Sequence, residues 1–166
     1  MNSIKLLLQQ LDEEVVKTLK MFSRLPDDKF DWQPHPKSMT IRKLAGHIAE
    51  LPGWVTIAVN TDELDFATAN YKTPEVNSAA DTLELLEQTY ADGRAHLVNA
   101  TEDLLDKSWV LRNGDYIIST RTKRDTVLVA IDQTIHHRAQ LGVYLRLLDI
   151  PVPGSYGPSA DEMQVS

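Results

Sequence analysis

The chain has no cysteine among its 166 residues, which rules out disulfides, thiolate metal ligands and a cysteine nucleophile. Basic residues are outnumbered: 17 Lys and Arg stand against 24 Asp and Glu, and the net charge is −7. Because nucleic-acid backbones require clustered cations, we expect no nucleic-acid partner. No apolar run reaches the roughly 20 residues of a membrane span. The N-terminus has no signal-peptide pattern. We therefore expect a cytoplasmic protein with no membrane contact.

Four segments place apolar residues at intervals of three and four, the spacing of an amphipathic helix. The first segment carries Ile4, Leu8, Leu11, Val15, Leu19 and Phe22 on one face. The segments span residues 3–24, 40–60, 79–100 and 125–149. The pattern predicts one all-α domain over residues 1–166, folded as a four-helix bundle.

Two local signals modify this pattern. Pro52 lies inside the second segment and cannot donate a hydrogen bond to the Ile48 carbonyl, so we expect a kink there. Asn113-Gly114 is a favoured two-residue turn between apolar and β-branched residues. It predicts a short β-hairpin at about 108–119, between the third and fourth helices and outside the bundle.

Helix starts carry capping residues. Ser38 or Thr40 can cap the second helix, and Ser78 has the spacing to Asp81 of a capping interaction at the third. Asp125 can cap the fourth helix.

Polar residues interrupt the apolar face of the fourth helix. The inward stripe, followed in steps of three and four, places Gln133 and His137 one turn apart, a rise of about 6 Å. His47 falls on the inward side of the second helix. Facing polar side chains from two helices are how bundle cores build metal sites. Equally, Gln133 and His137 could hydrogen-bond each other or a buried water.

Four further residues have both a functional and a structural interpretation. His136 lies about 100° around the helix from His137 and is either part of the site or an exposed or interface histidine. Glu50 follows His47 by one turn and is either an orienting partner or a surface acid. Trp54 and Tyr144 either line a pocket or fill the core.

Two blocks of sequence carry a family resemblance. They are "FDWQPHPKSMTIRKLAGHIAELPGW" (30–54) and "HHRAQLGVYLRLLDIPVPGSYGPSADE" (136–162). With the helical pattern, they resemble the DinB/YfiT-like superfamily of metalloenzymes. The resemblance implies a bundle of up-down-down-up topology, a homodimer, and one divalent metal, zinc or nickel, held by three histidines. His47 and His137 match two of these ligands, and Gln133 stands where the family has the third.

The resemblance also implies an activity. Relatives of this kind include S-transferases and isomerases that use small-molecule thiols. We therefore expect a metal-dependent transferase or hydrolase with His47, Gln133 and His137 as metal ligands. The alternative is a non-catalytic dimeric bundle with a degenerate metal site, and the amide at position 133 favours it, because an amide oxygen binds these metals more weakly than imidazole.

Overall fold

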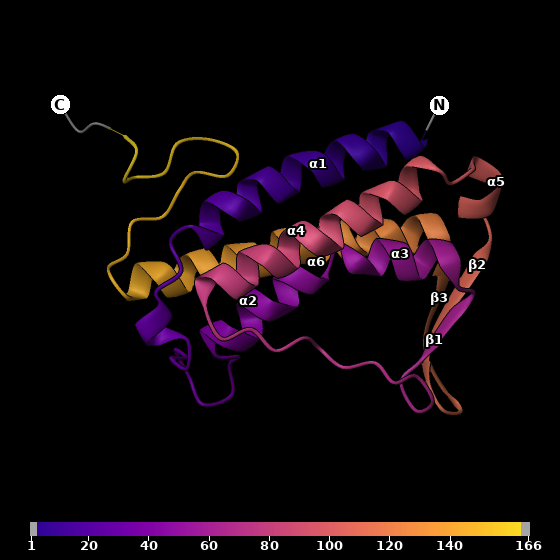
Figure 1. Cartoon of the computed structure of the whole chain (residues 1–166), viewed down its shortest axis with the longest axis horizontal. Helices are drawn as coiled ribbons and strands as arrows, with labels where there is room; N and C mark the ends of the chain where they lie inside the picture. The colour runs from indigo at the N-terminus through magenta and orange to yellow at the C-terminus, as the bar shows by residue number, and fades with distance from the viewer. Residues whose placement is uncertain (1–2, 164–166) are drawn as a thin grey trace.

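The computed structural model describes residues 3–163 (Figure 1). Its elements, in chain order, are α1 (Ser3–Phe22), the 3₁₀ turn η1 (Asp27–Lys29), α2 (Ile41–Glu50), α3 (Gly53–Asn60), β1 (Glu63–Asp65), α4 (Ala79–Val98), α5 (Glu102–Leu105), β2 (Ser108–Asn113), β3 (Tyr116–Thr122) and α6 (Lys123–Leu147). No helix within residues 3–163 is both long and apolar enough to cross a membrane.

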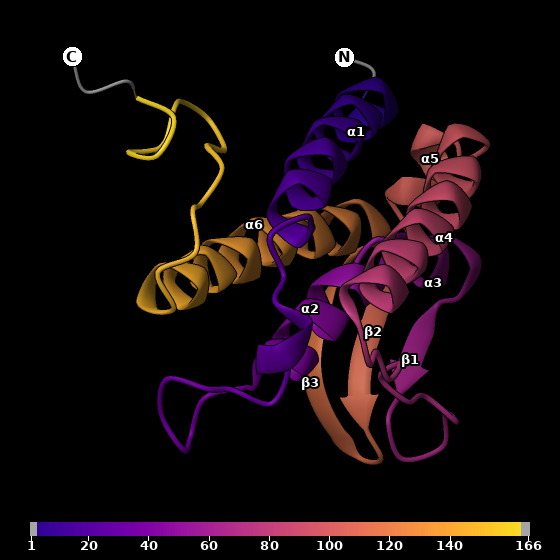
Figure 2. The same ribbon diagram turned by 60° about the vertical axis from the view of Figure 1, so that its left-hand side comes forward.

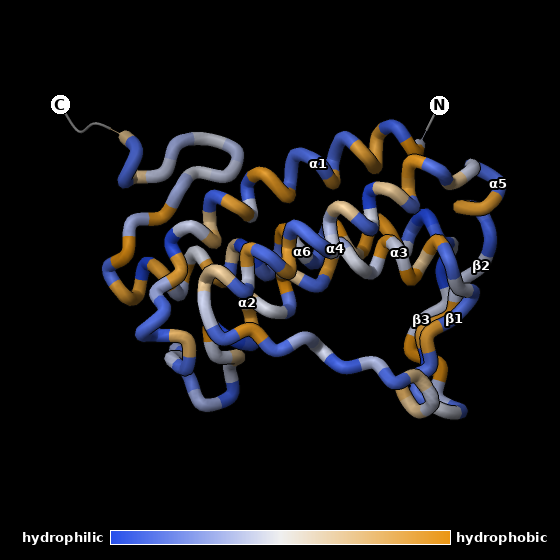
Figure 3. The backbone as a smooth tube through the Cα atoms, viewed as in Figure 1, coloured by the Kyte–Doolittle hydropathy of each residue, from blue (hydrophilic) through white to orange (hydrophobic). Residues whose placement is uncertain are grey.

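The long helices pack lengthwise around one core. α4 and α6 each contact α1, α2 and α3. In Figure 1, α1 and α6 run in one direction, and α2, α3 and α4 run in the other. Hydrophobic and hydrophilic residues alternate in short stretches along the helices (Figure 3), as helices with one buried face require. The expected helices are therefore present, although the second is divided in two.

The division falls at Pro52, where a kink was expected. Leu51 and Pro52 form a turn between α2 and α3, and the Val55 N–H donates to the Pro52 carbonyl at 3.1 Å. The turn packs closely on α4 at Gly93. A Cβ atom added there would lie 2.4 Å from the Pro52 carbonyl oxygen, so glycine is what allows α4 to approach this bend.

The buried face of α6 is rotated from the expected one. The buried positions include Ala130, Ile131, Thr134, Arg138, Leu141 and Leu145. Gln133 is exposed and His137 is half-buried, so the expectation that both lie on the buried seam was wrong. The reason is Arg138, which occupies the centre of the buried face because α1 supplies a partner for its charge.

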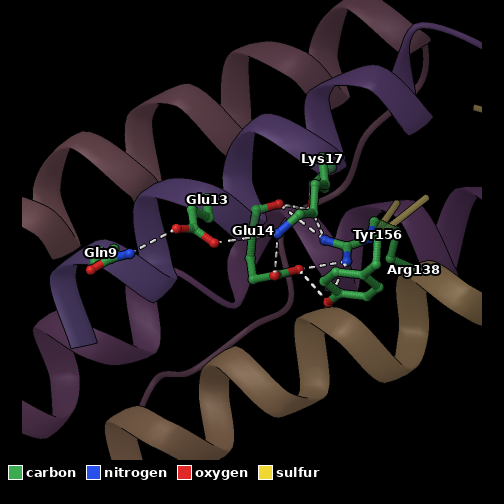
Figure 4. Close-up of polar contacts among 7 residues, drawn as sticks. Gln9, Glu13, Glu14, Lys17, Arg138 and Tyr156 are labelled. Atoms are coloured by element: carbon green, nitrogen blue, oxygen red, sulfur yellow. Dashed lines mark hydrogen bonds and ion pairs between the residues drawn. The ribbon is translucent and has the colours of Figure 1, made fainter. Parts of the chain in front are cut away.

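That partner is Glu14, and the pair is almost fully enclosed. Glu14 is 4% exposed and Arg138 is 1% exposed. The Arg138 guanidinium donates to the Glu14 carboxylate at 2.5 Å, and the Tyr156 hydroxyl donates to the same carboxylate at 2.9 Å (Figure 4). Lys17 donates to its other oxygen at 2.8 Å. The tail after α6 therefore turns back toward α1, as Figures 1 and 2 show.

The helix caps agree with the sequence at two starts. Thr40 caps α2 and Ser78 caps α4, each accepting a backbone N–H three residues on. The cap of α6 is Thr122, which accepts from the Asp125 N–H, so the expectation of Asp125 as the cap was wrong. The helix begins two residues earlier than expected, directly from the end of β3.

A three-stranded sheet of order β1-β2-β3 lies against the bundle (Figure 2). β2 and β3 pair antiparallel, and β1 pairs parallel to β2. The hairpin turn is Gly114-Asp115, one residue later than expected, with Gly114 at φ +59°. Asp65 fixes this turn by accepting from the Gly114 N–H at 2.8 Å. β2 and β3 both contact α6, so the hairpin forms a wall beside that helix.

Candidate metal centre

α2 and α6 bring two histidines into contact. The ring centroids of His47 and His137 lie 4.7 Å apart, with the rings inclined at 74°. Both side chains are half-buried and line the same cavity. Sequence reasoning predicted that these two residues meet, and the geometry confirms their contact.

A carboxylate fixes the orientation of His47. Its Nδ1 lies 2.7 Å from Oε1 of Glu50, a side chain that is 6% exposed. The other Glu50 oxygen accepts from the Tyr71 hydroxyl at 2.8 Å, and Tyr71 accepts from the Trp54 indole at 3.0 Å. A carboxylate accepts this bond from an Nδ1–H, and in that tautomer of the neutral imidazole Nε2 presents a lone pair.

The ring of His137 is held in the same manner by an amide. Its Nδ1 lies 2.8 Å from Oε1 of Gln140, and the Gln140 amide nitrogen lies 3.2 Å from Nε2 of His136. The amide oxygen accepts, so Nε2 of His137 also presents a lone pair. His136 thereby contributes to the site indirectly, through Gln140 and through ring contact with His137 at 4.9 Å.

The protonation of His137 suits a metal ligand. Burial lowers the pKa of His137, the hydrogen bond to Gln140 opposes this, and the neighbouring His47 and His136 lower the pKa further. The net direction is downward. His137 is therefore neutral near pH 7, the form in which imidazole binds a metal.

Two cavities border His47. The larger, of about 680 Å³, also has His137, Met39, Arg42, Lys43 and Glu75 in its lining. The smaller, of about 240 Å³, also has Gln133, Trp54, Trp109 and Arg121. Gln133 thus shares a cavity with His47, while His137 lies on the other one. Within residues 3–163 the Gln133 side chain makes no hydrogen bond, which leaves its amide oxygen free.

The polar side chains around His47 are the His137 imidazole in one cavity and the Gln133 amide in the other. Among the described residues, no three His, Cys, Asp or Glu side chains converge in an arrangement that could hold a metal ion. His47 and His137 supply two imidazoles, and position 133 carries an amide instead of a third. Two imidazole rings in contact, with a carboxylate behind one of them, are the features that fit a metal.

Of the other candidate residues, Glu50 and Trp54 lie at the site and Tyr144 does not. Glu50 is the orienting partner and Trp54 lines the smaller cavity. Tyr144 packs edge-on against Trp32 at 5.7 Å and is not among the residues lining either cavity beside His47, so its contact is that of a core residue.

Sequence reasoning missed four residues around the site. Tyr71 lies in an irregular loop, and no periodicity could have placed it. Gln140 follows His137 by three residues, a spacing that could have been noticed. Trp109 and Arg121 come from the hairpin, which was expected to lie outside the bundle.

Comparison with known proteins gives one family match. The family model described as "DinB family" matches residues 1–165. YrdA of Bacillus subtilis (strain 168), described as uncharacterized, is 27% identical over 159 residues, covering 93% of this chain and 89% of YrdA.

Solved structures show the same fold. A DinB-like protein from Bacillus cereus matches with a TM-score of 0.71 at 22% identity, over 90% of this chain and 95% of that one. YfiT from Bacillus subtilis, described as a probable metal-dependent hydrolase with an unusual four-helix bundle topology, matches with a TM-score of 0.66 at 15% identity, over 88% and 87%. A mycothiol-dependent maleylpyruvate isomerase matches with a TM-score of 0.61 at 14% identity, over 84% of this chain and 60% of that one.

Proposed function

Because the chain belongs to the DinB family, whose model spans residues 1–165, we propose that it is a metal-dependent enzyme of transferase or hydrolase type. One observation carries the proposal. His47 and His137 are in ring contact, and each has its Nδ1 engaged by a partner, which leaves two Nε2 lone pairs. Two imidazoles oriented in this way toward each other support a metal site.

The metal ligands in this proposal are His47, His137 and the amide oxygen of Gln133. Zinc or nickel suits the two imidazoles. When bound, such a cation acidifies a coordinated water or small-molecule thiol and so supplies a nucleophile near neutral pH. Glu50 holds the His47 ring in orientation, and Gln140 does the same for His137.

Two printed descriptions of relatives support the reaction classes. YfiT is described as a probable metal-dependent hydrolase, and the isomerase as mycothiol-dependent. The two cavities that border His47 give room for two reactants, as a group transfer from or to a thiol requires. A hydrolase needs only one of them for an organic substrate.

A second candidate is a non-catalytic dimeric bundle. The exposure of Gln133 and its neutral amide favour it, because an amide oxygen binds zinc or nickel more weakly than imidazole does. In this case the contact between His47 and His137 is a remnant of a site that no longer holds metal.

The experiment that separates the two candidates is thermal unfolding against zinc or nickel concentration, using protein without a histidine tag. A metal at a hundredfold excess over Kd that binds only the native state stabilises it by about 2.7 kcal/mol. Wild type should gain stability, Gln133→His should gain more, and His47→Ala should gain none. His136→Ala is the matched control and should keep most of the gain.

Two outcomes would contradict the site. If Gln133→His gains no more than wild type, residue 133 does not face the metal. If His136→Ala loses the gain as fully as His47→Ala, the ligand assignment on α6 is wrong. A wild type without any gain, beside a Gln133→His variant with one, would favour the non-catalytic bundle.

Three further expectations belong to the proposal. The opposed courses of the long helices support an up-down-down-up four-helix bundle topology. Val143 and Leu147, both more than half exposed on α6, offer an apolar surface for a homodimer. Light scattering that returned the monomer mass of 18.7 kDa would contradict the dimer. A cytoplasmic location stays a prediction.

A further inference from the structure

One face of the β2–β3 hairpin forms a wall of the smaller cavity. Trp109 lies directly opposite Arg121 in the antiparallel register, and Leu111 lies opposite Ser119. Alternate residues of a strand point to the same side. All four residues line the cavity of about 240 Å³, together with His47, Trp54 and Gln133. The hairpin therefore contributes these four side chains to the cavity beside His47.

Arg121 carries an unpaired charge in this wall. Six other arginines each form an ion pair with a carboxylate: Arg42, Arg94, Arg112, Arg124, Arg138 and Arg146. Arg121 forms no ion pair or hydrogen bond through its side chain within the part of the chain that the structure describes. A planar guanidinium with five donors matches a carboxylate, to which it can donate two parallel hydrogen bonds.

Most of the rest of the lining is apolar and includes two aromatic rings. The Trp54 and Trp109 ring centroids lie 6.5 Å apart, and Leu51, Leu111, Val129 and Ala130 add apolar surface, with Thr126 beside them. Trp109 is 2% exposed, and its indole is fixed by a hydrogen bond to Thr61 at 3.0 Å. Cavities that hold drug-sized ligands measure about 300–1,000 Å³. This one fits a smaller molecule, with a body about the size of a single ring.

We propose that this cavity binds a small organic carboxylate with a flat apolar body. Arg121 contacts the carboxylate, Ser119 offers a hydroxyl beside it, and the indoles of Trp54 and Trp109 contact the body. The ligand then lies next to His47 and Gln133. As a substrate class this rests on the proposed function, whereas the binding itself requires no metal.

The larger cavity is less suited to such a ligand. Arg42 there is already engaged by Asp31, the Val76 carbonyl and Asn77. Lys43 lines that cavity and is exposed, as Arg121 is, but Glu75 brings a negative charge to the same lining. Lys43 is therefore a matched control for Arg121, because both cations border a cavity that includes His47.

The test uses metal-free full-length protein and the indole N–H signals of its three tryptophans in ¹⁵N–¹H spectra. Single Trp→Phe variants assign the signals. Benzoate and cinnamate are the probes, and benzamide and inorganic phosphate are the comparisons. The Trp54 and Trp109 signals should shift with benzoate or cinnamate, while the Trp32 signal should not. Benzamide and phosphate should bind at least about tenfold more weakly, because each lacks one of the two features.

Arg121→Gln should lower the affinity for benzoate or cinnamate at least about tenfold. Lys43→Gln should change that affinity less than about twofold. Unshifted indole signals in the ligand-free variants show that the fold is kept. The proposal is overturned if neither carboxylate shifts Trp54 and Trp109, or if benzamide or phosphate binds equally well. It is also overturned if Lys43→Gln weakens binding as much as Arg121→Gln.

These outcomes are separate from those of the metal titration. If the protein binds the carboxylate but metal does not stabilise it, the smaller cavity is a carboxylate site and the metal-dependent function is rejected. Metal-dependent stabilisation without carboxylate binding would keep the function and reject this substrate class.

Discussion

At His47 a single carboxylate determines which ring nitrogen faces the candidate metal centre. Glu50 is buried, and its two oxygens accept from the His47 Nδ1–H at 2.7 Å and from the Tyr71 hydroxyl at 2.8 Å. Burial is the main reason that the pKa of Tyr71 is raised, and the hydrogen bond to Glu50 adds to it. Tyr71 therefore stays protonated and keeps its donor directed at the carboxylate. The ring orientation of His47 depends on this arrangement.

We expect Glu50→Gln to weaken zinc or nickel binding by about 10- to 100-fold, the usual cost of losing an outer partner of a metal-binding histidine. Glu75→Gln is the matched control, because Glu75 is an exposed acid on the larger cavity beside His47. The measurement is isothermal titration of metal-free protein with the ion. Equal loss in both variants would indicate a general effect of negative charge rather than orientation of His47.

The contact of His47 with His137 could be predicted from the sequence, but how far the side chains of the site are buried could not. The spacing on α6 cannot distinguish two neighbouring faces that both contain apolar residues. Arg138 decided between them, since burying its charge required Glu14 on α1, a partner 124 positions away. Tyr71 was beyond prediction for a related reason: its role depends on where a loop folds back and not on any local pattern.

At the scale of elements, the bend between α2 and α3 depends on two residues that are distant in the sequence, Pro52 at the bend and Gly93 on α4. Pro52 ends the hydrogen-bonding of α2, and its carbonyl at the bend faces Gly93 of α4. The bend lies between His47 on α2 and Trp54 on α3. Close packing of α4 at this point therefore fixes the relative positions of the two side chains that border the smaller cavity.

We expect Gly93→Ala to lower the free energy of unfolding by about 1–3 kcal/mol, the typical cost of overpacking. Its Cβ would lie 2.4 Å from a backbone oxygen, and backbone cannot move aside cheaply. Gly53→Ala is the matched control: its nearest neighbour would be 3.5 Å away, in ordinary contact, so the substitution should be neutral or stabilising. Urea denaturation measures both, and similar losses would contradict the close approach at Pro52.

Local signals predicted most elements but not how they associate. Pro52 marked the division of the second helix, and the apolar and β-branched run around Gly114 marked the hairpin. β1 was missed because three residues carry too little periodicity. Its pairing with β2 arises from a contact 47 positions apart, Glu63 with Val110. The hairpin packs on α6 because Trp109 and Leu111 form an apolar face that needs covering, and this made it part of the site.

Across the whole molecule, the tail, α1 and α6 meet at the Glu14 carboxylate (Figure 4). Burial alone would raise the pKa of Glu14, but hydrogen bonds from Lys17, Arg138 and Tyr156 together outweigh it and hold the pKa below its usual value of 4.5. A group whose pKa is lower in the folded state stabilises that state above its unfolded pKa. This contribution is lost as the pH falls through the lowered value.

We expect Glu14→Gln to destabilise the protein by about 3–5 kcal/mol near neutral pH, because it leaves the Arg138 charge buried without its counter-ion. The difference from wild type should stay constant from about pH 7 to about 5 and shrink below about 4.5, where Glu14 of the unfolded wild-type chain begins to gain a proton. Denaturation at several pH values measures it, and carboxylates common to both proteins cancel in the difference. Glu13→Gln is the control, since this neighbour is more than half exposed and should differ little from wild type at any pH. A Glu14→Gln difference that stays constant or grows on acidification would mean that the carboxylate charge does not hold α1, α6 and the tail together.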